Sequence, residues 1–190
     1  MKDYKSGEFT GDIIIPRKFL GLFNTFTADA VEILASENHL ISSFGDDTVY
    51  TRVIDERFPD YESVIPTDND KVLAVNRNDL LGAVRRVSIF SNKATHQIAL
   101  HLDDKKVRMT TEDPEKASRG QEDLSGAEYN GESLLIGYNA SYLRDIITHV
   151  QDENIIVKLK TPISATLFYP EKTDENIDLT MLLMPIRLND

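Results

Sequence analysis

The sequence predicts an α+β protein that repeats one unit: a strand, a helix and then three antiparallel strands. Three amphipathic helix patterns recur in the same frame along the 190 residues, and short strand patterns separated by turn residues follow each of them. A composition of 41% hydrophobic and 28% charged residues is typical of a folded protein with a substantial core. We therefore expect repeated α+β units with antiparallel sheets.

The three helix patterns lie in segments that share one plan: "DIIIPRKFLGLFNTF" (12–26), "KVLAVNRNDLLGAVRRV" (71–87) and "SLLIGYNASYLRDIITHV" (133–150). Apolar residues recur at i, i+3, i+4 and i+7, which is the spacing of one helix face. The three sets are Phe19, Leu22, Phe23 and Phe26; Leu80, Ala83, Val84 and Val87; and Leu143, Ile146, Ile147 and Val150. They are offset by 61 and 63 residues. Pro16, Asn76 and Asn139 precede the helices, where proline and asparagine are favoured.

Strand patterns follow every helix, and we predict antiparallel meanders from them. After the first helix they cover 30–37, 39–46 and 48–56. After the second they cover 96–102 and 106–112, before a polar loop at 113–123. After the third they cover 153–160, 163–169 and 177–188.

Two such repeats make one complete domain, which predicts a boundary between two parts of the chain. The second and third repeats form a domain over residues 66–190, and the first repeat, residues 1–65, is half of another. "FPDYESVIP" (58–66), with two prolines, is predicted to be the linker. We expect the chain to be a fragment of a longer protein.

No catalytic constellation stands out. The four histidines are scattered, and the pairs Asp46–Asp47 and Asp103–Asp104 suit tight turns better than metal binding. No glycine-rich phosphate loop, HExxH or GxSxG motif occurs. We therefore expect no catalytic site, no metal and no cofactor. The sequence has no cysteine, which fits a reducing compartment, and we expect a cytoplasmic protein.

Basic residues recur on the polar side of each helix pattern. The formal net charge of −11 disfavours non-specific nucleic-acid binding. Arg17 and Lys18, Arg85 and Arg86, and Arg144 nevertheless stand opposite the apolar stripes. They form either an ordinary solvated face or a local positive surface that contacts phosphates without reading bases.

The segment "VSIFSN" (87–92) places Ile89 and Phe90 where the second helix pattern ends. Exposed apolar clusters often mark subunit contacts. Alternatively, the helix ends near Val87 and both side chains turn inward.

Four segments closely resemble the bacterial sliding clamp family, the beta subunit of DNA polymerase III: "IDERFPDYESVIP" (54–66), "VRRVSIFSN" (84–92), "IGYNASYLRDII" (136–147) and "MPIRL" (184–188). The resemblance runs from about residue 12 to residue 188. It implies the DNA-clamp fold, with three domains of two repeats each. Residues 1–65 would be the second half of the middle domain, and residues 66–190 the complete C-terminal domain.

The resemblance also implies a non-catalytic function. Two full-length subunits close head-to-tail around duplex DNA and act as the processivity factor of the DNA polymerase III holoenzyme, a DNA-directed DNA polymerase and hence a nucleotidyltransferase. The resemblance places Arg17, Lys18, Arg85, Arg86 and Arg144 toward the DNA. It places Ile89, Phe90 and the edge near 113–124 at the homodimer interface. We expect that the ring cannot close without the first domain. The alternative is an intracellular α+β protein-interaction module without a DNA role.

In this family the C-terminal strand lines a hydrophobic cleft that binds short peptides of polymerases, the clamp loader and repair proteins. Carried over by position, its residues are Pro59, Val64, Asn139, Tyr142, Ile163, Ala165, Leu182, Leu183, Met184, Pro185, Ile186 and Arg187. A methionine adapts to many partner sequences, and a proline belongs at a strand edge, where backbone groups stay free for a peptide. The alternative is an edge strand buried in its own sheet, which we keep open for Leu183 and Leu188.

Overall fold

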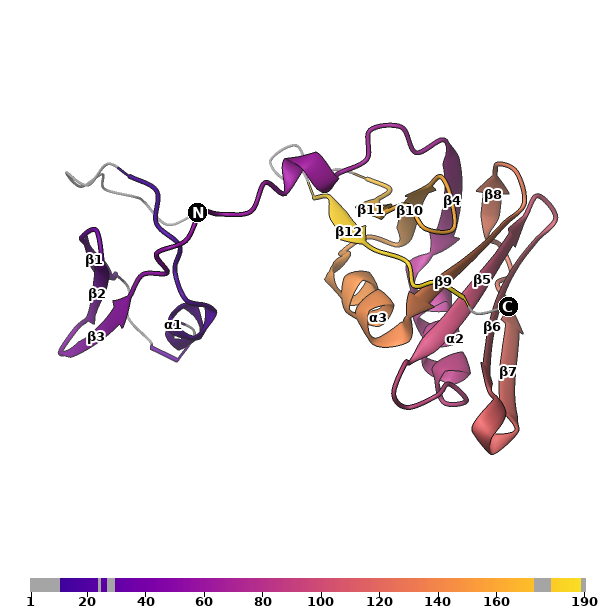
Figure 1. The fold of residues 1–190 in the computed structure, drawn as a ribbon, viewed down its shortest axis with the longest axis horizontal. Helices are drawn as coiled ribbons and strands as arrows, with labels where there is room; N and C mark the ends of the chain where they lie inside the picture. Colours follow the sequence, from indigo (N-terminus) through magenta and orange to yellow (C-terminus); the bar gives the residue numbers. More distant parts are fainter. Residues whose placement is uncertain (1–10, 24, 27–29, 173–178, 189–190) are drawn as a thin grey trace. The chain divides into compact units, whose positions relative to one another are not determined.

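The computed structural model describes residues 11–23, 25–26, 30–172 and 179–188. The chain divides into two compact units, residues 1–60 and 61–190, here called the N-terminal and C-terminal units. The division falls within the predicted linker, residues 58–66. Figure 1 shows the helices and strands of each unit. Among the described residues, no helix combines the length and the apolar character that crossing a membrane requires.

The N-terminal unit consists of helix α1 (Arg17–Leu22) and an antiparallel sheet of three strands in the order β1-β2-β3. The strands are β1 (Glu32–Ala35), β2 (His39–Phe44) and β3 (Asp47–Arg52). Ahead of α1, Ile14 forms an antiparallel bridge with Ile54, which follows β3.

The expected extension of this helix to residue 26 is wrong, because α1 ends at Leu22. Thr25 closes the last turn: its backbone N–H and its hydroxyl both donate to the carbonyl oxygen of Leu22, at 2.9 and 2.7 Å. The aromatic side chains beyond the helix still pack together. The rings of Phe23 and Phe26 lie 5.0 and 4.3 Å from that of Phe44, measured between centroids. The predicted apolar stripe therefore forms an aromatic cluster with β2.

The C-terminal unit contains two sheets and two helices. One sheet has the strand order β12-β11-β10-β4-β8 and the other β7-β6-β5-β9, and all neighbouring pairs are antiparallel. The elements are η1 (Glu62–Val64), β4 (Lys71–Asn76), α2 (Arg77–Ser88), β5 (Gln97–Asp103), β6 (Lys106–Asp113), η2 (Pro114–Lys116), β7 (Ser118–Asp123), β8 (Glu128–Asn130), β9 (Leu134–Asn139), α3 (Ala140–His149), β10 (Asn154–Leu159), β11 (Thr166–Pro170) and β12 (Met181–Leu183).

The polar loop expected at 113–123 is wrong. The short 3-10 turn η2 is followed by strand β7, which pairs with β6 along its whole length. β7 is an edge strand of sequence SRGQED, with polar residues on both faces, so it shows no apolar alternation. One of these faces is held by an ion pair, because Glu122 accepts from Arg86 of α2.

The two repeats of the C-terminal unit exchange their leading strands, that is, the strand before each helix. The leading strand β4 of the second repeat pairs with β10 of the third, and the leading strand β9 of the third pairs with β5 of the second. Asn76, at the end of β4, stands opposite Asn154, the first residue of β10. Asn139 likewise stands opposite Gln97, the first residue of β5. Each sheet thus needs both repeats.

The chain after the third strand of a repeat, here called its tail, returns to that repeat's own leading strand. In the second repeat β8 pairs with β4, and in the third Ile186 bridges to Gly137 of β9. The bridge between Ile14 and Ile54 is the counterpart in the first repeat. Each leading strand of the C-terminal unit therefore has two neighbours. On one side lies the tail of its own repeat, and on the opposite side lies a strand of the other repeat.

Helices α2 and α3 lie side by side (Figure 1). Their apolar stripes enter one core shared by both sheets. The predicted positions of α2 are buried, as are Leu143, Ile147 and Val150 of the third set, while Ile146 is partly buried against the core. Asparagines cap both helices. The Asn76 side chain accepts from the amides of Asn78 and Asp79, and the Asn139 side chain from those of Ser141 and Tyr142. Such caps satisfy backbone donors that have no partner within the helix.

Candidate peptide-binding cleft

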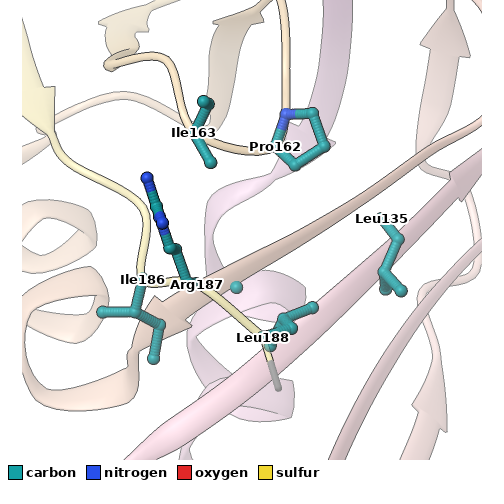
Figure 2. A pocket seen from close by; sticks show the side chains of 7 residues that line it. Leu135, Pro162, Ile163, Ile186, Arg187 and Leu188 are labelled. Carbon is teal, nitrogen blue, oxygen red and sulfur yellow. The ribbon is translucent and has the colours of Figure 1, made fainter. Parts of the chain in front are cut away.

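A cavity of about 380 Å³ lies on the C-terminal unit where three elements meet. Strand β9, the loop between β10 and β11, and the tail after β12 each contribute to it (Figure 2). Its lining residues are Leu135, Gly137, Pro162, Ile163, Ile186, Arg187 and Leu188. Arg187 carries the one charge among these described lining residues. The cavity therefore suits an apolar side chain with a polar or anionic group beside it.

The tail reaches the cavity because β12 is short. Only Met181–Leu183 pair with β11, so the continuous strand predicted over 177–188 is wrong; residues 177–178 lie outside the described residues. Pro185 lacks a backbone N–H and so cannot donate to a continued ladder. The chain then crosses to the other sheet, where the Ile186 amide donates to the Gly137 carbonyl at 2.9 Å. The tail thus joins the two sheets and forms one wall of the cavity.

Gly137 permits this close approach. A Cβ atom at this position would lie 2.6 Å from Cδ2 of Leu188 and 2.8 Å from the backbone oxygen of Ile186. Real Cβ contacts are not that short, so any side chain here would displace the tail.

The loop opposite the tail is held by side-chain hydrogen bonds. Thr161 and Ser164 hydroxyl oxygens lie 2.5 Å apart, and the Ser164 amide donates to the Thr161 hydroxyl at 3.1 Å. Asn69 donates from its side-chain amide to the carbonyls of Lys158 and Ala165 at 2.9 and 3.1 Å. These bonds fix both ends of the loop, which presents Ile163 with 58% of its surface exposed.

The twelve predicted cleft residues fall into groups. Pro59 belongs to the N-terminal unit and the other eleven to the C-terminal unit. Ile163, Ile186 and Arg187 line the cavity. Val64, Tyr142 and Met184 are exposed; Asn139, Leu182 and Pro185 are partly buried; Ala165 and Leu183 are buried. Leu183 therefore supports the wall from its own sheet, as the edge-strand alternative expects.

Four lining residues were not predicted as cleft residues: Leu135, Gly137, Pro162 and Leu188. Leu188, for which a place in its own sheet is the alternative expectation, lines the cavity. Leu135 alternates with the buried Leu134 and Ile136 on β9, so its outward position follows from the period-2 pattern. Gly137, in an otherwise apolar strand, signals a close backbone approach.

The predicted DNA-facing residues occupy exposed helix positions. Arg17 and Lys18 lie on α1, Arg85 and Arg86 on α2, and Arg144 on α3. Arg86 makes a two-point ion pair with Glu122 of β7, with N–O distances of 2.6 and 2.9 Å. The hydrogen bonds from Arg86 lower the pKa of the Glu122 carboxyl. Part of the Arg86 charge is therefore balanced within the protein.

The predicted interface residues Ile89 and Phe90 follow the end of α2 at Ser88. They are 75% and 44% exposed, so the alternative in which both turn into the core is wrong. Phe90 lies against β7, because a Cβ atom on Gly120 would be 2.8 Å from its ring. The Ser118 hydroxyl donates to the Phe90 carbonyl at 3.1 Å. Phe90 thus packs beside the edge strand β7, and the exposed Ile89 precedes it in the chain.

The end of β7 carries a second charge cluster. Asp123 accepts hydrogen bonds from Arg108 at 2.6 Å and pairs with Lys106 at 2.8 Å. Hydrogen bonds from Arg108 and then Lys106 lower the pKa of Asp123 to about 2. Within the described part of the chain, no three His, Asp or Glu side chains gather at a site that could hold a metal ion.

Solved structures similar to this chain include bacterial DNA sliding clamps. The clamp of Pseudomonas aeruginosa solved with a ligand aligns with a TM-score of 0.81 at 32% identity, over 93% of this chain and 48% of that one. The clamp of Bartonella birtlesii bound to griselimycin gives 0.82 at 31% identity, over 93% and 47%. The fold is therefore the α+β clamp fold with antiparallel sheets.

Sequence comparisons agree with the fold. The family model for the DNA polymerase III beta subunit, C-terminal domain, matches residues 62–187. The beta sliding clamp of Pseudomonas aeruginosa is 32% identical over 179 residues, and that of Escherichia coli K12 is 26% identical over 179 residues. The chain belongs to the family of the DNA polymerase III beta subunit, the beta sliding clamp, which is a non-catalytic subunit of that polymerase. It spans about half the length of these curated relatives, 47% and 48%.

Proposed function

We propose that this chain is part of a processivity clamp that encircles duplex DNA and tethers a DNA polymerase and its accessory proteins. In this assignment residues 1–65 are the second half of the middle domain and residues 66–190 are the C-terminal domain. Membership of the family and the division of the chain at residues 60 and 61 support it. DNA replication takes place in the bacterial cytoplasm, so we assign the protein to that compartment.

The cavity on the C-terminal unit is the proposed docking site for short peptides of the polymerase, the clamp loader and repair proteins. The observation that carries this proposal is the crossing of the tail from β12 to β9, because it leaves an apolar cavity beside an open strand edge. No other described strand pairs with the outer edge of β12, so an extended peptide can add to it. Arg187, at the cavity, suits a carboxylate or backbone carbonyl of such a peptide.

The exposed bases are proposed to contact the phosphate backbone. Arg85 and Arg144 lie on two helices that pack together, which supports one shared surface. Contacts of arginine with phosphates hold DNA without reading its sequence, and a clamp that slides needs such contacts. In the full-length ring, Ile89, Phe90 and the β7 edge would face the other subunit.

The test is a fluorescence-polarisation titration of the chain with a labelled clamp-binding peptide from a replicative polymerase, with a scrambled peptide as the control. We expect saturable binding of the first peptide and no binding of the second. Ile163→Ala should weaken the binding of the first peptide about 3- to 10-fold, because over half of an isoleucine side chain loses its burial against the peptide, about 1 kcal/mol. Met184→Ala should weaken it as well. Ile89→Ala is the control, because Ile89 is equally apolar and more exposed but does not line the cavity. Equal affinity of the Ile163 and Ile89 variants would contradict the proposed site.

A further inference from the structure

The sulfur atoms of this chain all belong to methionines, and their burial differs. The chain has no cysteine and four methionines, of which Met109, Met181 and Met184 lie within the described residues. Met109 is fully buried at 0% exposure, and Met181 is partly buried against the core. Met184 is 56% exposed. Because an oxidant in solution must contact the sulfur atom, Met184 is the most accessible of the three to oxidation.

Met184 stands between the open edge of β12 and the cavity. It follows Leu183, the last residue of β12, and precedes Pro185. Leu183 enters the core, whereas Met184 turns away from it. Ile186, two residues further on, lines the cavity. No other described strand pairs with the outer edge of β12, so a peptide that adds to this edge and fills the cavity passes beside Met184.

The Met184 side chain suits an apolar contact while its sulfur is a thioether. A thioether is polarisable, and the flexible side chain that carries it packs against partners of different shape. A sulfoxide is polar instead, and its oxygen accepts hydrogen bonds. When a peptide covers this oxygen, the oxygen loses water and needs a donor from the protein or the peptide. The next residue, Pro185, has no backbone N–H to donate. Oxidation therefore makes it unfavourable to cover Met184.

We propose that Met184 is an oxidation site that controls peptide binding at the cleft. Hydrogen peroxide transfers an oxygen atom to the Met184 sulfur: the S–O bond forms, the O–O bond of the peroxide breaks, and water is released. The thioether is oxidised to the sulfoxide and the peroxide is reduced. A methionine sulfoxide reductase reverses the change, since a pair of thiols is oxidised to a disulfide and the oxygen leaves as water. This regulation rests on the proposed function of the cleft. It releases bound peptides under oxidising conditions and restores their binding after repair.

Oxidation mapping tests the site without any peptide. The chain is treated with hydrogen peroxide, and mass spectrometry of its fragments reports which methionines have gained an oxygen. We expect Met184 to be oxidised faster than Met181 and much faster than Met109, in the order of their exposure. Oxidation of Met181 or Met109 as fast as that of Met184 would overturn the proposal.

The peptide titration tests the control of binding. For each variant the dissociation constant is measured before and after peroxide, and the ratio of the two values is compared. The ratio should be about 5- to 100-fold for the unaltered chain, because a buried polar group without a partner weakens binding to that extent. Met181→Leu, a conservative change on the same strand, is the matched control and should give the same ratio. Met184→Leu should give a ratio near one, whatever its starting affinity. Methionine sulfoxide reductases with dithiothreitol should return the oxidised chain to its original affinity.

The outcomes separate this proposal from that of the cleft. If the untreated chain binds the peptide and the chain oxidised at Met184 binds it equally well, the control by oxidation is refuted and the cleft stands. A Met184→Leu chain that loses affinity after peroxide would likewise refute it, because another residue would then be responsible. If the untreated chain does not bind the peptide, the cleft itself is refuted, and the control of its binding with it.

Discussion

Gly137→Ala should weaken peptide binding by the C-terminal unit while leaving its free energy of unfolding nearly unchanged. The new Cβ would lie 2.6 Å from Leu188 and 2.8 Å from the Ile186 backbone oxygen. The backbone oxygen is not the end of a flexible side chain, so the tail itself must move. The expected result is a tail displaced from β9, with the hydrogen bond between Ile186 and Gly137 lost.

The expected change in folding stability is small. Losing one backbone hydrogen bond costs about 0.5–1.5 kcal/mol. Replacing a strand glycine by alanine returns about 0.5–1 kcal/mol through lower chain entropy in the unfolded state. The two effects nearly cancel, so the free energy of unfolding should change by less than about 1 kcal/mol.

The expected change in peptide affinity is larger. Ile186 and Leu188 are partly exposed and line the cavity that a peptide would fill. Burying such a side chain fully gives about 1.5–3 kcal/mol, and losing half of this for both residues gives about 1.5–3 kcal/mol. The dissociation constant should therefore rise about 10- to 100-fold.

The measurement pairs urea unfolding with the peptide titration on the same variant. Gly21→Ala is the control, because a Cβ there meets nothing within 4 Å and an alanine favours helix α1. It should leave the affinity unchanged. If Gly137→Ala binds the peptide as tightly as the unaltered chain, the close approach of the tail to β9 is not needed and the argument fails.

Three further predictions concern stability. Tyr138→Phe removes a buried hydrogen bond of 2.6 Å to Thr166 and should lower the free energy of unfolding in urea by about 1–3 kcal/mol. A change near zero would mean that the Thr166 hydroxyl finds another partner in the variant. Asn76→Ala should cost about 1 kcal/mol through the lost helix cap, and Asn139→Ala more, since its side chain also donates to a backbone carbonyl; equal costs would contradict this. Asp123 has a folded pKa of about 2, below its ordinary 3.8, so its stabilisation is present above that ordinary value and is lost as the pH falls toward about 2. Asp123→Asn should lose less stability over that pH range, and an unchanged acid profile would exclude this carboxylate as a cause.

The repeat was predictable because periodicity reports which residues are buried. The stripes of the second and third helices became the core, and the asparagines at their starts became caps. The strand pattern did not predict β7, because an edge strand with ion-paired side chains shows no apolar alternation; only the resemblance to the clamp family indicated an edge near 113–124. The end of α1 was missed because Thr25 closes the turn within an uninterrupted apolar pattern. In both places polar side-chain bonds, which leave no periodic signal, decided the local structure.

The candidate site was predicted in part. Ile163, Ile186 and Arg187 line the cavity, and they were assigned by resemblance to the clamp family. Pro162 was not predicted as a lining residue, because hydrogen bonds from the distant Asn69 position its loop and no local sequence pattern indicates them. The exchange of leading strands is likewise a tertiary feature. Short strands with similar patterns do not reveal from the sequence which strand each will pair with.

The exchange of leading strands has a consequence for how the C-terminal unit folds. β4 and β10 are about eighty residues apart in the chain, yet they are directly paired neighbours inside one sheet. Pairing strands that are far apart in the chain costs conformational entropy, because a large loop must close before the stabilising contacts form. We therefore expect the unit to fold in milliseconds to seconds, slower than helical bundles, which fold in microseconds. Neither repeat can complete a sheet on its own. The two repeats of the C-terminal unit should therefore unfold together in a single thermal transition. If either repeat is removed, the other should not form a stable folded structure.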